Sequence, residues 1–491
     1  RHREEILKAE AGTLLFNLGK THVGFWEKKN GNTFFRNIDK SAFKKCFGYH
    51  PFPGYRCYHQ KTDLNKTPFE IDLSFSQELT NFFWNTEIVF DFINQHNSMT
   101  LKDVVKGNVS GAQLIKKVMF RGCENINSGI DKGAPKEQLK ELQIANAFGT
   151  IKDEITDQDK KYEDHERYDC RRRKFFKEID EEFSRVGWDK IGASFVRRTL
   201  LEKTKEWYSL LLSDTRFPVN DVTLWDQVYM TASMFKASLA AMCLEDGKYD
   251  EYMVKPREIK WSILGVQYDK LGLAEKALTS AFIDWYRNET ERVDEKVKAV
   301  IEEKYALGNE IYRDESGIYF IVPENILGER FEEKVGVYRL KEELGPVRED
   351  LISCFKSFTG EVFPSILLTE PSRGTMNIAY LLDNAKKYFL MPEFPKDGSV
   401  TDYFQDTDDA AGFRVICDIC RVRLAKKDEE DLNLCSICRQ RKEGREKDRL
   451  RNAGKETIWT GELQDENRRI ALVTMKFELA DWLNGNMLNT M

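Results

Sequence analysis

Histidine is scarce in this sequence, with 6 residues in a chain of 491. No apolar run approaches the roughly 20 residues that a membrane span needs, and the charged opening RHREEILKAE does not read as a secretion signal. Cations are not in excess, because 82 acidic residues outnumber 76 basic ones and give a formal charge of −6. These absences exclude a chain-wide basic field for nucleic acid and leave local basic patches open. They predict a cytoplasmic protein without a membrane partner.

The length, together with 41% hydrophobic and 32% charged residues, is typical of about three globular domains. Residues 1–245 carry apolar side chains at three- and four-residue spacing, which predicts a mainly helical domain. Residues 254–370 read as strands and helices in the order βαββαβ, with a hairpin joined at residues 314–317, which is typical of a ferredoxin-like domain. A connector rich in Pro, Gly, Asp and Ser follows at 371–412. The predicted fold class is therefore a multidomain α+β protein.

Four of the ten cysteines form two Cys-x-x-Cys pairs, Cys417 with Cys420 and Cys435 with Cys438. Two such pairs can place four thiolates in a tetrahedron around one Zn²⁺, and this closed site is structural because no position stays open to water. Residues 413–445 are therefore predicted to form a zinc ribbon. The other six cysteines are expected to be free thiols in a reducing cytosol.

Basic residues flank the four cysteines. They either follow a phosphate backbone or belong to a solvated charged surface, and the sequence leaves both interpretations open. These residues are Arg421, Arg423, Lys426, Lys427, Arg439, Arg441, Lys442 and Arg445.

Two further segments contain motifs. AEAGTLLFNLGK is similar to the metal-dependent HD phosphohydrolase helix, with Phe16 and Asn17 where a His-Asp pair belongs. SDTRFPVNDVTLWDQVYMTASMFKA is similar to a pattern in the large, palm-containing subunit of type III CRISPR effector complexes, with Val222 and Gln227 where two histidines belong. The resemblance extends over nearly the whole chain, because its parts follow the same order: a helical domain, a first palm, a four-cysteine ribbon and the beginning of a second palm at 468–491. The matching residues of the second motif are Asp214, Thr215, Arg216, Pro218, Asp221, Trp225, Asp226, Thr231 and Ala232.

The resemblance implies the large subunit of an RNA-guided antiviral ribonucleoprotein. Its implied partners are the guide RNA, the target RNA and the other type III effector subunits, and its place is the end of the guide that carries the repeat-derived tag. Family members cut single-stranded DNA at the HD site. Phe16, Asn17, Val222 and Gln227 cannot replace metal ligands, so the HD nuclease is expected to be inactive and the subunit mainly a scaffold that senses target pairing.

The second palm of the family makes cyclic oligoadenylates from ATP and Mg²⁺. In this chain the strand that begins at Ile470 offers Glu478 and Asp481 as cofactor-binding carboxylates, although surface charge at a strand end explains them slightly better. The Gly-Gly-Asp-Asp hairpin of the ATP site is missing from these residues, so the second palm is expected to be truncated. Two alternatives to a scaffold stay open: a cyclic oligoadenylate synthase completed by a missing part, and a free-standing zinc-ribbon protein that binds nucleic acid.

The first palm also contains carboxylates at suggestive positions. Asp269 ends the first strand, and Asp314 with Glu315 occupies the hairpin tip, as metal ligands do in a catalytic palm. In the family, this copy supports the nucleotide site without supplying the main metal ligands. Turn chemistry alone also explains Asp and Glu at a hairpin tip, and it is the favoured interpretation of these residues.

Overall fold

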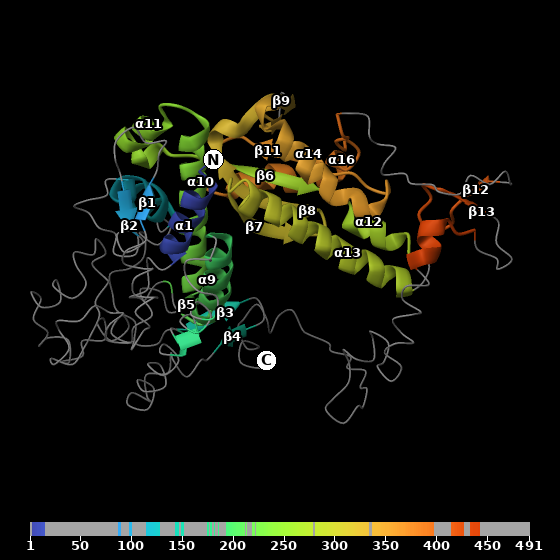
Figure 1. Cartoon of the computed structure of the whole chain (residues 1–491), viewed down its shortest axis with the longest axis horizontal. Helices are drawn as coiled ribbons and strands as arrows, with labels where there is room; N and C mark the ends of the chain where they lie inside the picture. The colour runs from blue at the N-terminus through green and yellow to red at the C-terminus, as the bar shows by residue number, and fades with distance from the viewer. Residues whose placement is uncertain are drawn as a thin grey trace, which may run out of the picture.

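The computed structural model combines helices with antiparallel strands (Figure 1), which confirms the mixed character of the predicted fold. No helix in the part of the chain that it describes is both long and apolar enough to cross a bilayer. The described ranges, with isolated positions between 174 and 213, are 2–14, 87–89, 98–100, 114–127, 143–146, 149–151, 193–211, 219–220, 222–277, 280–332, 336–396, 414–426 and 433–441.

A six-stranded antiparallel sheet forms the centre of the structure. In spatial order its strands are β7 (Asn309–Asp314), β8 (Gly317–Pro323), β6 (Trp261–Gln267), β11 (Ser365–Thr369), β10 (Val337–Leu340) and β9 (Leu327–Glu332). Three of the four inner strands, β8, β6 and β11, are buried at every position. Their near-continuous apolar sequences suit strands that are covered on both faces.

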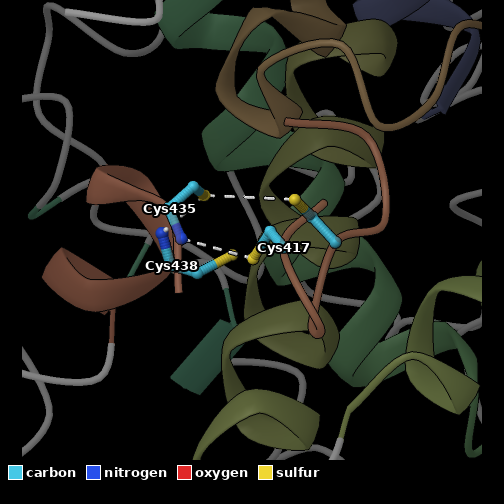
Figure 2. Close-up of side chains that lie close together, drawn as sticks. Cys417, Cys435 and Cys438 are labelled. Carbon is cyan, nitrogen blue, oxygen red and sulfur yellow. Dashed lines mark hydrogen bonds between the residues drawn. The ribbon is translucent and has the colours of Figure 1, made fainter. Parts of the chain in front are cut away.

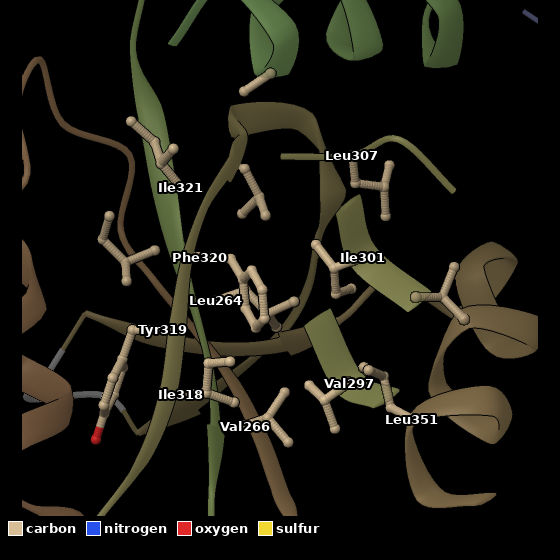
Figure 3. Close-up of a cluster of buried hydrophobic side chains, with 14 of the residues drawn as sticks. Leu264, Val266, Val297, Ile301, Leu307, Ile318, Tyr319, Phe320, Ile321 and Leu351 are labelled. Atoms are coloured by element: carbon tan, nitrogen blue, oxygen red, sulfur yellow. The ribbon is translucent and has the colours of Figure 1, made fainter. Parts of the chain in front are cut away.

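Two helices cover one face of this sheet. They are α13 (Ser280–Ala299), which continues into the π-helical turn η9 (Val300–Lys304), and α14 (Gly345–Ser353). Figure 3 shows their apolar side chains against those of β6 and β8, and each fully buried aliphatic or aromatic side chain contributes about 1.5–3 kcal/mol to folding. The buried residues of this contact include Leu264, Val266, Val297, Ile301, Ile318, Phe320 and Leu351.

The elements β6, α13, β7, β8, α14 and β11 follow one another in the order read from the sequence. The hairpin predicted at residues 314–317 is confirmed, because Asp314 pairs with Gly317 across the turn. Gly317 has φ +152°, and a Cβ at this position would lie 2.4 Å from the backbone oxygen of Val266, so the tight turn requires glycine. The hairpin β9–β10 was not predicted. It lies between β8 and α14 in sequence and adds two strands beside β11.

Three helices from the first part of the chain lie together at one end of the sheet (Figure 1). They are α1 (Arg3–Leu14), α9 (Ala193–Tyr208) and α10 (Leu224–Leu244). Most residues of α10 are buried, as expected for a helix that is apolar around most of its circumference. Trp261 at the start of β6 donates its indole N–H to the backbone oxygen of Met234 in α10 at 2.9 Å, so the helix and the sheet are in direct contact.

Short strands also occur in the region predicted to be mainly helical, where no alternating apolar pattern indicates them. They are β1 (Glu87–Val89), β2 (Ser98–Thr100), β3 (Gln143–Asn146), β4 (Gly149–Ile151) and β5 (Val219–Asn220). Shorter helical segments elsewhere include η4 (Ile115–Glu124), α7 (Asn125–Asn127), α11 (Lys248–Val254), α12 (Lys270–Glu275), α15 (Ala379–Leu382) and α16 (Ala385–Tyr388).

A buried ion network joins the three helices to the sheet. Arg197 of α9 contacts Glu10 of α1 at 2.7 Å and Glu302 of η9 at 2.6 Å. Lys236 of α10 contacts the same oxygen of Glu10 at 2.8 Å and donates to the side-chain oxygen of Asn309 in β7 at 2.9 Å. All five residues are at most 2% exposed. Two cations balance two anions here, so the buried charges are compensated only while all four elements stay together.

Lys236 gives this network a dependence on pH. Burial, followed by repulsion from Arg197, lowers the pKa of Lys236 to about 8. Between about pH 8 and the ordinary lysine value of about 10.4, the unfolded chain holds more protons than the folded one, so the free energy of unfolding rises with pH. Relative to a Lys236→Met variant, the wild type should gain on the order of 1–2 kcal/mol between about pH 7.5 and pH 9.5 in urea denaturation. A difference that does not change with pH would contradict this assignment.

Candidate metal centre

The four cysteines lie on two short segments. Strands β12 (Arg414–Ile416) and β13 (Leu424–Lys426) form a hairpin, and Cys417 and Cys420 lie in its turn. The turn is closed by a hydrogen bond from the Cys417 amide to the backbone oxygen of Arg423 at 2.9 Å, and Arg421 takes a left-handed conformation with φ +55°. Cys435 and Cys438 lie at the start of a helical segment at 436–441. Each pair therefore presents two sulfurs from a single turn of backbone.

The four sulfur atoms converge on one point. All four lie within 4.8 Å of one another, and the sulfurs of Cys420 and Cys435 are 4.0 Å apart. A tetrahedral site with metal–sulfur bonds of about 2.3 Å has sulfur–sulfur edges of about 3.8 Å, so a small contraction accommodates an ion. Figure 2 shows Cys417, Cys435 and Cys438 pointing toward one another, and all four cysteines are at most 2% exposed. The predicted ligand set is therefore brought together and can hold a metal ion.

Backbone and side-chain donors surround these sulfurs. The Cys435 amide donates to the sulfur of Cys417, and the Cys438 amide donates to the sulfur of Cys435, both at 3.4 Å. The guanidinium of Arg423 donates to the sulfur of Cys435 at 3.2 Å. Hydrogen bonds from the neighbouring thiols, from Cys417 first, hold the pKa of Cys435 well below its ordinary value, and Arg423 adds to this effect. The Arg423 guanidinium therefore favours the thiolate form of Cys435, which is the form that binds metal.

The two cysteine-bearing segments, 414–426 and 433–441, are called the ribbon below, and the six-stranded sheet with its helices, 261–369, is called the sheet domain. The ribbon is attached to the sheet domain through the carboxylate of Glu361. One oxygen of Glu361 accepts hydrogen bonds from Arg423 and Arg441, both at 2.7 Å, and the other accepts from the hydroxyl of Tyr286 at 2.5 Å. The guanidinium of Arg441 also lies 3.4 Å from the ring centroid of Trp285 in α13. Burial, followed by the nearby Glu361, raises the pKa of Tyr286. The ribbon thus contacts the first turns of α13, at the end opposite to η9 and the ion network.

Two of the basic residues that flank the cysteines have a role that the sequence did not indicate. Both interpretations placed them at the surface, yet the side chains of Arg423 and Arg441 are only 2% and 5% exposed and pair with Glu361. Arg421 and Arg439 are exposed, as either interpretation requires. Lys427, Lys442 and Arg445 lie outside the described residues. Glu361 had no signal of its own, because a lone glutamate before a strand is common at surfaces.

Two of the four positions that correspond to the HD site, Val222 and Gln227, lie among the described residues. Phe16 and Asn17 lie beyond the end of α1 and outside the described residues. Val222 is 44% exposed just before α10, whereas Gln227 is buried within α10 and its backbone oxygen accepts a hydrogen bond from Asn127 at 2.8 Å. In the part of the chain that the structure describes, the four cysteines are the only group of three or more His, Cys, Asp or Glu side chains placed to hold a metal.

Asp226, which matches the type III motif, caps helix α10. Its carboxylate accepts hydrogen bonds from the amide and the hydroxyl of Thr223, both at 2.8 Å, and the Asp226 amide donates back to Thr223 at 3.4 Å. Asp226→Ala removes this capping box, so we expect the free energy of unfolding to fall by about 1 kcal/mol in urea denaturation. Asp246→Ala, at an exposed position after the same helix, is the matched control. Equal stabilities of the two variants would contradict the capping role.

The carboxylates at the end of β6 and at the tip of the β7–β8 hairpin are held by local hydrogen bonds. Asp269 accepts from the Gly272 amide at 2.8 Å and caps α12. Asp314 accepts from the amide and the hydroxyl of Ser316 at 2.9 and 2.6 Å, and Glu315 is exposed. These contacts agree with the turn interpretation of the hairpin. The other predicted cofactor ligands, Glu478 and Asp481, lie outside the described residues.

No family model matches the chain, and no curated protein matches it in sequence. The chemistry of the centre therefore follows from its donor set. Four cysteines complete a tetrahedral coordination shell and leave no position for water or substrate. The four buried sulfurs can therefore hold a metal ion such as zinc.

Proposed function

We propose that this chain is the large, palm-containing subunit of a type III CRISPR ribonucleoprotein, in which it serves mainly as a scaffold at the tag end of the guide RNA. The observation that carries the proposal is the way three parts pack together. Helices α1, α9 and α10 join one end of a six-stranded sheet through a buried ion network, and a four-cysteine ribbon joins the far end of α13. The sequence motifs that resemble this subunit occur in the same order.

The sheet supports the palm assignment for residues 254–370. Its strands β7, β8, β6 and β11 have the order of a ferredoxin-like domain, with the first strand of the unit, β6, between the third and the fourth. The two helices of the unit, α13 and α14, cover one face, as the βαββαβ order requires. The hairpin β9–β10 is an addition to this unit. The proposed division of the chain keeps a helical domain at 1–245, a connector at 371–412, a zinc ribbon at 413–445 and the beginning of a second palm at 468–491.

The metal proposed for the ribbon is Zn²⁺ with a structural role. A donor set of four cysteine sulfurs favours a soft or borderline metal, and zinc takes such sites in a tetrahedral arrangement without redox chemistry. The buried position of the four sulfurs fits a closed site. Arg423 donates to the sulfur of Cys435 and offsets part of the charge that four thiolates bring.

The proposed role is that of a scaffold without DNase activity. Val222 and Gln227 supply no imidazole where the family places its histidines, and Asp226 uses its carboxylate to cap α10. A one-metal or two-metal nuclease site needs more ligands to hold its metal and activate water than these positions provide. In this proposal the subunit binds the tag end of the guide RNA and senses target pairing. Other subunits of the complex cleave the RNA.

The free-standing ribbon is the less favoured alternative. Its affinity for nucleic acid would depend on basic side chains around the cysteines, and two of these, Arg423 and Arg441, are buried against Glu361. The cyclase alternative depends on a completed second palm. In the first palm the carboxylates of Asp269 and Asp314 are engaged in capping and turn contacts, so we do not assign ATP or Mg²⁺ to them.

The proposal is tested by purifying the tagged full-length protein from the cells that express it naturally. We expect guide RNA and further effector subunits to elute with it in a single large complex, which nucleic-acid extraction and mass spectrometry would identify. The same tag on an unrelated cytoplasmic protein is the control. Recovery of a monomer without RNA would contradict the proposal and favour the free-standing ribbon.

The cyclase alternative has its own measurement. The purified complex is incubated with ATP, Mg²⁺ and a target RNA complementary to its guide, and the products are separated by chromatography. The scaffold proposal expects no cyclic oligoadenylate. Formation of such a product only when target RNA is present would replace the scaffold role by a synthase.

A further inference from the structure

Arg423 contacts the cysteine cluster and the sheet domain at the same time. On the ribbon side its Nε donates to the sulfur of Cys435 at 3.2 Å, and its Nη2 lies 3.6 Å from the sulfur of Cys438. On the other side Nη2 donates to Glu361 at 2.7 Å and Nη1 donates to the backbone oxygen of Thr359 at 2.8 Å. This guanidinium therefore spans the boundary between the two parts.

The geometry of a guanidinium links these two sets of contacts. Its five N–H donors are fixed in one plane, so Arg423 can satisfy the sulfurs and Glu361 together only while they keep their relative positions. The side chain is only 2% exposed, which prevents water from replacing a lost partner without opening the boundary. The positions of the two sulfurs in turn depend on whatever holds the four cysteines together.

We propose that Arg423 is a positioning residue that makes the docking of the ribbon on the sheet domain depend on metal occupancy. The inference rests on the metal centre proposed above. A bound ion fixes the four sulfurs and makes them anionic acceptors, for which a guanidinium forms charge-assisted hydrogen bonds. Removal of the ion lets the sulfurs separate, and Arg423 loses a fixed set of acceptors inside the boundary.

The contacts around Glu361 would carry this change into the sheet domain. Glu361 also binds Arg441 and Tyr286, and Arg441 stacks on Trp285. These residues hold the segment 354–361 and the start of α13 against the ribbon. Undocking exposes this segment, whereas β6 and β8 lie in the buried centre of the sheet and keep their hydrogen bonds.

Hydrogen–deuterium exchange on the full chain tests the inference, together with the zinc content of each sample. We expect a chelator to release about one zinc per chain and to speed exchange in peptides from 354–361 about tenfold, with peptides from β6 unchanged. Arg423→Gln should keep its zinc and yet exchange at 354–361 as fast as the chelated wild type. Glu361→Gln, which leaves every sulfur contact in place, should behave in the same way. Arg421→Gln, at an exposed position of the same turn, should match the wild type.

The outcomes separate the inference from the metal proposal on which it rests. If the wild-type protein purifies without zinc, this result contradicts the proposed metal centre and therefore also the inference. Zinc-bearing wild type whose exchange at 354–361 is unchanged by chelation, or by Arg423→Gln, would overturn the inference and leave the metal centre intact. If Arg423→Gln and Glu361→Gln both lose zinc, Arg423 serves to retain the metal. This result would also overturn the inference.

Discussion

Arg197→Met is expected to lower the free energy of unfolding by about 3–5 kcal/mol, the largest loss among single substitutions in the ion network. Removal of the guanidinium leaves Glu10 and Glu302 facing each other without the cation that contacts both at 2.7 and 2.6 Å. The pKa of Glu10 is lowered in the folded chain, because Arg197 and Lys236 outweigh the effect of its burial, which would raise it. Urea denaturation followed by circular dichroism measures the loss.

The adjacent residue on the same helix supplies the control. The side chain of Arg198 is 62% exposed and lies 3.5 Å from Glu303, so Arg198→Met removes a surface ion pair worth about 0–1 kcal/mol. A loss for Arg197→Met no larger than that for Arg198→Met would contradict the network. The comparison keeps the helix, the residue type and the substitution the same and changes only burial.

The network could be predicted only in part from the sequence. Glu10 and Arg197 occupy amphipathic helices with other charges, and nothing local distinguishes them from surface residues. Their contact joins positions 187 residues apart, which neither periodicity nor spacing reveals. Lys236 did offer a signal, because it is the only Lys, Arg, Asp or Glu between Tyr229 and Leu244 in an otherwise apolar helix. A lysine in such a helix predicts a buried anionic partner, although not its identity.

The sheet was more accessible to sequence reasoning than the helical part. A continuous apolar run such as GIYFIVP, which begins at Gly317 directly after the turn residues Glu315 and Ser316, gives both the strand and its hairpin register. Strand β9 has the sequence LGERFE, whose charges suit the edge of a sheet and hide its strand character. The sequence pattern therefore predicts the βαββαβ elements but not the hairpin β9–β10 that is inserted between them.

The cysteine centre shows the same division between local and distant information. Spacing within each Cys-x-x-Cys pair is a local property, and it identified the four residues whose sulfurs the structure brings together. Arg423 and Arg441 acquire their roles from Glu361, which lies 62 and 80 residues away in sequence. Basic residues near a ribbon therefore do not by themselves indicate contact with nucleic acid.

Cys435→Ser is expected to remove zinc from the protein and to unfold the ribbon while the sheet domain stays folded. A serine hydroxyl is a poor replacement for a thiolate, and three remaining sulfurs leave the tetrahedron open to water. Zinc binding accounts for about 10–16 kcal/mol in isolated zinc-finger peptides, which exceeds what so small a segment gains from its own core. Zinc content should fall from about one per chain to none, measured by release to a colorimetric chelator.

Cys243→Ser is the matched control for this substitution. Cys243 lies in α10 and is not one of the four cysteines whose sulfurs converge, and burial raises the pKa of its thiol to about 12. Its variant should retain the zinc of the wild type, whereas Cys435→Ser should lose it and become sensitive to protease within 414–441. The sheet domain depends on the contacts of β6, β8, α13 and α14, so its thermal unfolding should stay close to that of the wild type. Full zinc content in Cys435→Ser would show that the zinc is bound elsewhere in the chain.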